Sequence, residues 1–159
     1  MRLAVRSLLV ADRDGLAEIL RDTPQFSPEE SACALEMIDS CLNDPARGEY
    51  EHVVATDDGD RPVGYACFGP TSLTAGTYDL YWIAVRFQEQ RLGVGSSLLE
   101  RVECDVEQAG GRMLLIQTSG RPDYAAARAF YAKNGYVEVA RIEDYYAVGD
   151  DIVICRKRF

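Results

Sequence analysis

A glycine-rich stretch near the middle of the chain has the residue types of a phosphate-binding loop. The stretch Gln90-Arg91-Leu92-Gly93-Val94-Gly95-Ser96-Ser97-Leu98-Leu99 follows an apolar run and opens a helical pattern. Two glycines separated by one residue let the backbone turn sharply and come close to a ligand. The amides of the first helical turn lack intrahelical partners, and together with the helix dipole they favour an anion such as a pyrophosphate. The stretch therefore indicates a site for a nucleotide-bearing cofactor.

The composition of the chain restricts its partners. The 159 residues carry a formal net charge of −9. This charge disfavours nucleic acid, because binding there is dominated by attraction to phosphate, and it suits a cationic substrate. No apolar run approaches the roughly 20 residues of a spanning helix, and the first residues lack the apolar stretch of a signal peptide. We therefore expect a cytoplasmic protein that binds neither nucleic acid nor membrane.

Metal binding has few candidate ligands. The chain has five cysteines, none in a Cys-x-x-Cys pair, and a single histidine, His52. These residues do not suit a zinc site, so we expect no metal. The cysteines are expected to be small buried hydrophobic side chains in a reducing compartment. A histidine can serve as a general base near neutral pH, but His52 lies far in sequence from the glycine-rich stretch.

The patterns around this stretch predict one α/β domain over residues 1–159. Ser27-Pro28-Glu29-Glu30 predicts a helix start, with a serine cap and a proline in the first turn, and Asp12 is expected to cap the first helix. A Rossmann domain is excluded because regular β-α alternation is missing. The element order predicts an α/β (α+β) sandwich with crossover helices in its second half. Strands are predicted over 3–9, 49–56, 62–68, 77–85, 113–118, 136–142 and 151–155, and helices over 15–21, 28–42, 94–109 and 124–134.

Two motifs in this order resemble those of the GCN5-related N-acetyltransferase (GNAT) superfamily. The first is Trp82-Ile83-Ala84-Val85 followed by Gln90-Arg91-Leu92-Gly93-Val94-Gly95, and the second is Ala129-Phe130-Tyr131-Ala132-Lys133-Asn134-Gly135-Tyr136. The resemblance covers essentially the whole chain. It implies a GNAT-like fold with a mixed, mostly antiparallel central sheet of about seven strands. The sheet would be splayed between strands 4 and 5 and flanked by about four helices.

The resemblance implies an acetyl-CoA site between the strand that ends at Val85 and the strand 113–118. In the family these parallel strands part, so that backbone groups near Ile83 and Val85 pair with the pantetheine amides. The Val85 amide would donate to the acetyl oxygen, and Arg86 and Arg91 would be the local cations at the pyrophosphate. The implied cofactor-binding residues are Ile83, Ala84, Val85, Gln90, Arg91, Leu92, Gly93, Val94, Gly95, Ser96, Ser97, Phe130 and Tyr131.

Acetyl transfer to an amine also requires a proton donor for the departing thiolate. Tyr131 aligns with the family tyrosine that protonates the coenzyme A thiolate, and a tyrosine hydroxyl is protonated at working pH. The alternative is that Phe130 and Tyr131 form an ordinary buried aromatic pair. The ammonium of the acceptor requires a base. The related ribosomal-protein alanine acetyltransferases use a glutamate where this chain has Gln117, and glutamine cannot take up a proton usefully.

Asp79 and Tyr81 are the candidate catalytic replacements for that glutamate. They alternate along the predicted strand 77–85 and so are expected to face the same side. The alternative for Asp79 is a solvated carboxylate at a sheet edge. The segment from Asp144 to Asp151, which includes Tyr145 and Tyr146, is either an acidic and aromatic rim over the acceptor pocket or a plain turn.

The sequence is compatible with three functions. The first is an acetyl-CoA-dependent N-acetyltransferase that acts on a primary amine of a small molecule by direct transfer through a ternary complex. The second is acetylation of a protein N-terminus or lysine, and the third is a non-catalytic acyl-CoA-binding module. The expected partners are acetyl-CoA and an amine acceptor. The sequence is also compatible with a homodimer, because relatives associate through their closing strands.

Overall fold

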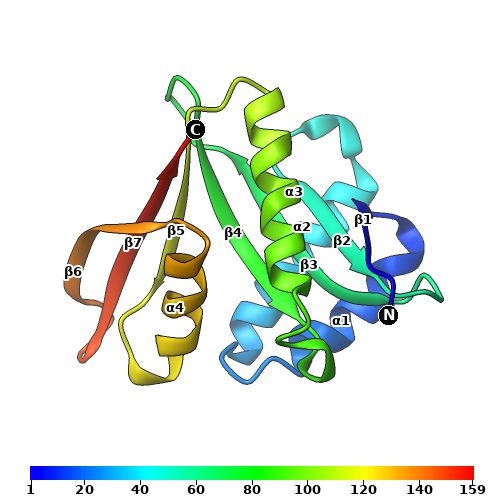
Figure 1. Ribbon diagram of the computed structural model, residues 1–159, viewed down its shortest axis with the longest axis horizontal. Coiled ribbons are helices and arrows are strands. Elements are labelled where there is room, and N and C mark those ends of the chain that lie inside the picture. Colours follow the sequence, from blue (N-terminus) through cyan, green and yellow to red (C-terminus); the bar gives the residue numbers. More distant parts are fainter.

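One seven-stranded sheet runs through the computed structural model, which describes residues 1–159 (Figure 1). The strand order is β1-β2-β3-β4-β5-β7-β6, and only β4 and β5 are parallel. The four helices and the mixed, mostly antiparallel sheet confirm the predicted fold class. The elements are β1 (Ala4–Ser7), α1 (Arg13–Arg21), α2 (Pro28–Asn43), β2 (Glu51–Thr56), β3 (Pro62–Pro70), β4 (Thr77–Val85), α3 (Val94–Gln108), β5 (Met113–Ser119), α4 (Ala125–Lys133), β6 (Val137–Ala147) and β7 (Asp150–Arg158), with the short 3₁₀ turns η1 (Val10–Asp12), η2 (Pro45–Arg47), η3 (Phe87–Glu89) and η4 (Pro122–Tyr124).

The starts of the first two helices differ in how well the sequence predicts them. Ser27 accepts the Glu30 amide hydrogen at 3.1 Å, which confirms the predicted cap of α2. Asp12 makes no cap to α1, so that prediction is wrong. Its carboxylate is buried and binds the Arg6 guanidinium at 2.8 Å. A buried carboxylate is stable only when a partner compensates its charge. The Arg6 guanidinium supplies that charge, which the uncharged helix amides do not.

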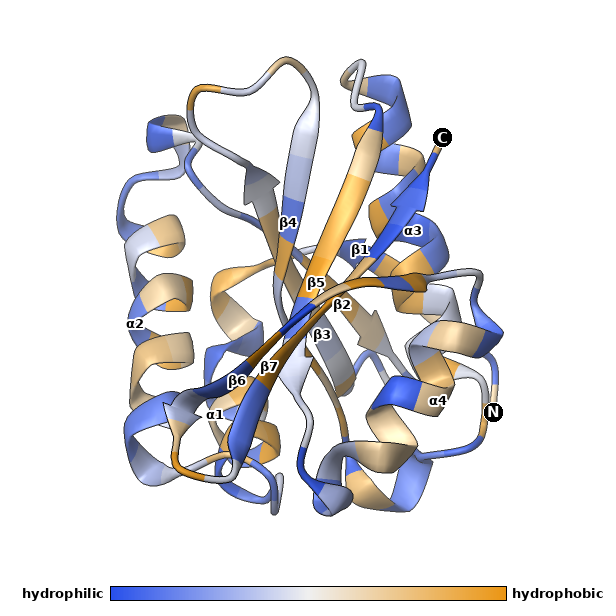
Figure 2. Ribbon diagram, turned by 90° about the vertical axis from the view of Figure 1, so that its left-hand side faces the viewer, coloured by the Kyte–Doolittle hydropathy of each residue, from blue (hydrophilic) through white to orange (hydrophobic).

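Helices cover the sheet on both faces. α1 and α2 pack on β2, β3 and β4 through a core that includes Leu16, Ile38 and Tyr65. α3 and α4 pack on the opposite face through a core that includes Leu98 and Leu114. Figure 2 shows α2 and α4 on opposite sides of the strands. The two faces are called here the α1/α2 side and the α3/α4 side.

A β-bulge in β4 changes which side its residues face. Cys67 of β3 pairs with Trp82, but the next residue, Phe68, pairs with Leu80, so Tyr81 is an extra residue on β4. Leu80 lies in the core on the α3/α4 side, whereas Trp82 packs against the core on the α1/α2 side. Without the bulge these two residues would share a face. The bulge therefore brings Tyr81 and Trp82 to the α1/α2 side together.

β4 and β5 are joined only at their first residues. Pairing runs from Thr77 with Met113 to Leu80 with Ile116 and then stops, although both strands continue. Figure 1 shows the two strands together at one end and parted at the other. This confirms the predicted splay between strands 4 and 5. The parted ends leave backbone groups of β4 without a partner strand on that side.

The burial of the cysteines agrees only in part with the expectation from the sequence. Cys67 and Cys155 are buried, but Cys33 and Cys104 are exposed, so the expectation that the cysteines are buried is wrong for these two. They lie on outward-facing positions of α2 and α3, where side-chain type is little constrained.

None of the helices has the length and apolar character needed to span a bilayer.

Candidate active site

The loop before α3 presents a row of free amides. Gly93, with φ of +82°, precedes the helix, and no side chain caps it. The N–H groups of residues 91–96 donate to no acceptor within the protein. Such amides, at the positive end of a 15-residue helix, form a cradle for an anion. The glycine-rich stretch therefore has the geometry that a pyrophosphate requires.

The second glycine of the motif lets α4 approach this cradle. A Cβ atom on Gly95 would lie 3.1 Å from Cζ of Phe130, closer than ordinary contact. Phe130 thus packs directly beside the free amides. Arg91 makes no ion pair, which leaves its charge available to an anion. Arg86, the other expected cation, instead donates to the Pro62 carbonyl and lies 3.6 Å from the Glu18 carboxylate.

We expect Gly95→Ala to raise the Kd for acetyl-CoA about tenfold, because the new methyl group and the Phe130 ring crowd each other and shift the backbone of the cradle. Titration calorimetry on the folded variant measures this change. Gly59→Ala is the matched control, because Gly59 lies in the turn between β2 and β3, and its added Cβ would meet only Asp57 at an ordinary 3.5 Å. An unchanged Kd for Gly95→Ala would contradict the placement of the pyrophosphate.

The end of β4 directs backbone groups into the gap between β4 and β5. The Arg86 amide donates to Val63 of β3 at 2.8 Å. Backbone groups of an antiparallel strand alternate in direction, so those of Val85 and Ile83 point away from β3, toward β5. Because β5 has parted from β4 there, the backbone groups of Ile83 and the Val85 amide are free for a ligand. The Gln90 side-chain amide donates to the Val85 carbonyl at 3.4 Å and links the loop to the strand.

Tyr131 lies on the α3/α4 side with its ring 8% exposed. It packs between Phe130 and Tyr136, with ring centroids at 5.5 Å and 6.3 Å. Its hydroxyl makes no hydrogen bond within the protein. Burial raises the pKa of Tyr131 above the usual value, so the hydroxyl keeps its proton at neutral pH. A protonated hydroxyl without a protein partner can donate to a ligand atom.

Asp79 and Tyr81 lie on the opposite side of the sheet from Tyr131. Asp79 accepts a hydrogen bond from the Thr71 hydroxyl at 2.5 Å and has no cationic partner. Burial, and to a lesser degree the charge of Asp79, raises the pKa of Tyr81. Tyr81 is the first residue beyond the joined part of β4 and β5, and Asp79 precedes it by two. Both residues therefore flank the point where the strands part.

The other residues singled out from the sequence lie in different settings. Gln117 is exposed at the first position of β5 past the joined part. His52 is buried on β2 beside Cys67, away from the gap. Asp144 accepts the Gly149 amide hydrogen and donates its own amide hydrogen to Asp151, so both carboxylates serve the β6–β7 hairpin. No group of three or more His, Cys, Asp or Glu side chains is arranged to hold a metal ion.

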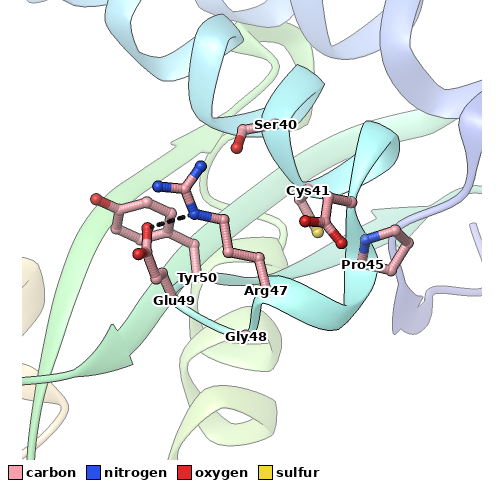
Figure 3. A pocket seen from close by; sticks show the side chains of 8 residues that line it. Ser40, Cys41, Pro45, Arg47, Gly48, Glu49 and Tyr50 are labelled. Atoms are coloured by element: carbon pink, nitrogen blue, oxygen red, sulfur yellow. Dashed lines mark ion pairs between the residues drawn. The ribbon is translucent and has the colours of Figure 1, made fainter.

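Two recesses mark the surface on the α1/α2 side. One, at the end of β4, contains Val85 and Gln90 of the predicted cofactor residues, and its lining is Ile19, Asp22, Thr23, Val85, Arg86, Phe87, Gln88 and Gln90. The other lies between α2 and β2 and contains none of the predicted residues (Figure 3). Its lining is Ser40, Cys41, Asp44, Pro45, Arg47, Gly48, Glu49 and Tyr50.

Two contacts near the gap involve residues that the sequence did not indicate. Tyr50 packs against Tyr81, with ring centroids 5.3 Å apart. The Tyr124 hydroxyl donates to the Gln25 carbonyl at 3.0 Å, which ties the start of α4 to the segment between α1 and α2. These pairs join segments 31 and 99 positions apart, counted from the residue numbers, and no local pattern carries that information.

Comparison with known proteins identifies the class. Residues 48–138 match the family model described as an acetyltransferase (GNAT) domain. A crystal structure of a GNAT-family protein from Desulfovibrio desulfuricans is 42% identical, with a TM-score of 0.94 over 99% of each chain. The chain therefore belongs to the GNAT family and is an N-acetyltransferase. No curated protein matches the sequence significantly.

More distant structures share the fold. The ribosomal-protein-S18-alanine N-acetyltransferase from Escherichia coli is 23% identical, with a TM-score of 0.77 over 99% of this chain and 94% of that one. An aminoglycoside 6′-N-acetyltransferase complexed with coenzyme A is 18% identical, with a TM-score of 0.78 over 98% of this chain and 96% of that one. The first is named for a ribosomal protein and the second for an aminoglycoside, so the fold does not specify the acceptor.

Proposed function

We propose that this protein moves the acetyl group of acetyl-CoA to a primary amine of a small molecule by direct transfer in a ternary complex. The observation that carries the proposal is the parting of β4 and β5 beside the free amides of residues 91–96. The amides suit the pyrophosphate, and the free backbone groups of Ile83 and Val85 suit the pantetheine amides. A coenzyme A complex of a structural neighbour supports the same donor.

The residues around the gap supply the roles that the reaction needs. Acetyl-CoA supplies an activated acetyl thioester. The Val85 amide hydrogen stabilises charge on the acetyl oxygen. Asp79 lies six residues before Val85 on β4, about 20 Å along an extended strand, so it accepts the ammonium proton through a chain of waters, and the neutral nitrogen forms the new C–N bond. As the C–S bond breaks, Tyr131 gives its proton to the sulfur and regains one from solvent.

Two observations favour a small amine over a protein terminus. The position at which related ribosomal-protein alanine acetyltransferases carry a glutamate is Gln117, which cannot accept a proton, so this chain lacks that arrangement. The remaining carboxylate at the gap, Asp79, lies on β4 instead. The family assignment also favours a catalyst over a binding module. A cytoplasmic location is part of the same proposal, because acetyl-CoA is a cytoplasmic metabolite.

An assay of acetyl transfer tests the proposed function. Pure protein is incubated with acetyl-CoA and a panel of primary amines, and free thiol is followed with a chromogenic disulfide. We expect thiol release that depends on the amine, together with acetyl-CoA binding by calorimetry. Absence of both thiol release and binding would overturn the proposal, whereas binding without release from any amine would favour the non-catalytic module.

We expect Asp79→Asn to lower kcat about tenfold at pH 7.5 and only about twofold at pH 10. An alkylamine with a pKa near 10.4 is mostly protonated at pH 7.5 and needs the base, whereas at pH 10 much of it is already neutral. Steady-state rates at both pH values measure the effect. Asp14→Asn is the control, since that side chain is 96% exposed. A defect of equal size at both pH values would argue that Asp79 has only a structural role.

A further inference from the structure

The α1/α2 side of the gap carries an aromatic surface that the reaction itself does not require. Tyr81 packs edge-on against Tyr50, with an angle of 84° between the ring planes, and 39% of Tyr81 is exposed. Next to it, Trp82 packs edge-on against Phe26 at 5.3 Å and donates its indole hydrogen to the Met37 sulfur. The bulge in β4 places these two aromatic pairs side by side.

The backbone below Tyr81 is shaped to hold its ring in place. A Cβ on Gly69 of β3 would lie 3.5 Å from the Tyr81 ring and would collide with the Glu49 carbonyl oxygen. A glycine is therefore required where the ring crosses β3. Tyr50 itself lines the recess between α2 and β2 (Figure 3). The Tyr50–Tyr81 pair is thus a fixed surface rather than a pair of loose side chains.

Asp79 is the carboxylate whose charge acts on Tyr81, whereas Asp44, which also forms no ion pair, lines the recess beside Tyr50. Glu49 is paired with Arg47 at 3.2 Å, as Figure 3 shows. Asp79 has only the Thr71 hydroxyl as a partner, so its other oxygen accepts no hydrogen bond and no cation pairs with its charge. A carboxylate next to aromatic rings attracts an ammonium group through both the charge and the ring faces. One such carboxylate matches one ammonium group.

Resting on the proposed function, we infer that the acceptor is a monoamine carried on a flat apolar body, of the arylalkylamine class. Its ammonium group is attracted into the gap by the charge of Asp79, and its body packs on Tyr81 and Tyr50, which makes Tyr50 a specificity-determining residue. A polycationic sugar amine would need several free carboxylates. A peptide would need unpaired backbone partners along its length, and on the joined part of β4 these are taken by β3 and β5.

The test compares 2-phenylethylamine, n-propylamine, kanamycin and a hexapeptide that begins with alanine, in the wild type and in matched variants. We expect kcat/KM for 2-phenylethylamine to exceed that for n-propylamine at least tenfold, with kanamycin and the peptide lower than both. Tyr50→Leu should reduce this ratio about tenfold, because the aromatic contact with the phenyl ring is lost. Tyr50→Phe keeps the ring and should keep the ratio. Phe159→Leu removes an aromatic ring at the C-terminus that is 39% exposed, like Tyr81, and should change nothing.

The outcomes separate the inference from the proposed function. Acetylation of amines with equal use of the two monoamines, or with preference for kanamycin or the peptide, overturns the inference and leaves the proposed function standing. A Tyr50→Leu variant that loses both monoamine activities equally also overturns it, because the role is then structural. No thiol release from any amine overturns the proposed function and the inference together.

Discussion

Tyr131→Phe should lower kcat about a hundredfold and leave the Kd for acetyl-CoA within about twofold. The substitution removes one hydroxyl, and that hydroxyl makes no hydrogen bond within the protein, so the fold loses no internal partner. General acid catalysis by a positioned side chain typically contributes a factor of about 10² to 10⁴. The loss should therefore appear in the chemical step. Steady-state kinetics and calorimetry on the same preparation measure the two quantities.

Tyr136 provides a matched control from the same motif. Its hydroxyl donates to the Glu103 carboxylate at 2.9 Å, and Lys157 binds the other oxygen of that carboxylate. Tyr136→Phe should therefore cost about 1.5 kcal/mol of stability, typical of a hydrogen bond to a charged group, and leave kcat unchanged. If Tyr131→Phe also keeps its rate, the proton for the thiolate comes from elsewhere, and Phe130 and Tyr131 are only a packed aromatic pair.

The pH dependence gives a second check on Tyr131. Burial raises the pKa of this hydroxyl, so it remains protonated through the range in which the acceptor amine becomes neutral. We expect kcat to rise with pH up to at least about 10, as amine deprotonates, with no earlier decline caused by Tyr131. A decline beginning near pH 8 would show that a group with a lower pKa is the acid.

Local patterns in the sequence were enough to predict most elements. The strand predicted over 77–85 has those bounds in the structure, because the apolar and aromatic run from Leu80 to Val85 and the residues just before it lie between two polar loops. β6 extends beyond its predicted end at 142 to Ala147. The residues in between lack alternation, and Asp144 has a φ of +54°, so pairing with β7 is interrupted there and resumes only at Ala147. A periodicity argument cannot follow a strand through such an irregularity.

The parts of the site that the sequence could not predict depend on register between strands. Alternation places Leu80 and Trp82 on one face, but the partner strand imposes a bulge at Tyr81 that separates them. The same register brings Tyr50 to Tyr81. Arg86 was expected beside the pyrophosphate because of its position in the chain. Its side chain turns instead to the Pro62 carbonyl, a partner on the neighbouring strand.

His52 should make the protein sensitive to mild acid. The ring is 5% exposed, stacks on Tyr65, and lies 3.8 Å from the Cys67 sulfur, with Nδ1 unpaired. Burial lowers the pKa of His52 to about 4, against about 6.5 for histidine in an unfolded chain. Between these values the unfolded state binds a proton that the folded state excludes, so stability falls as pH falls. The full difference corresponds to about 3 kcal/mol, of which about 2 kcal/mol is lost between pH 7 and pH 5.

The measurement is urea denaturation of the wild type and His52→Leu at pH 7 and pH 5, followed by the fluorescence of Trp82, the single tryptophan. Carboxylates also titrate in this range, but they are common to both proteins, so the difference between the two pH dependences isolates His52. We expect the wild type to lose about 2 kcal/mol more than the variant. Because His52 adjoins the core under Ala84 and Trp82 of β4, acid should loosen the strand that holds the site. Equal losses in the two proteins would show that the ring is protonated in the folded state.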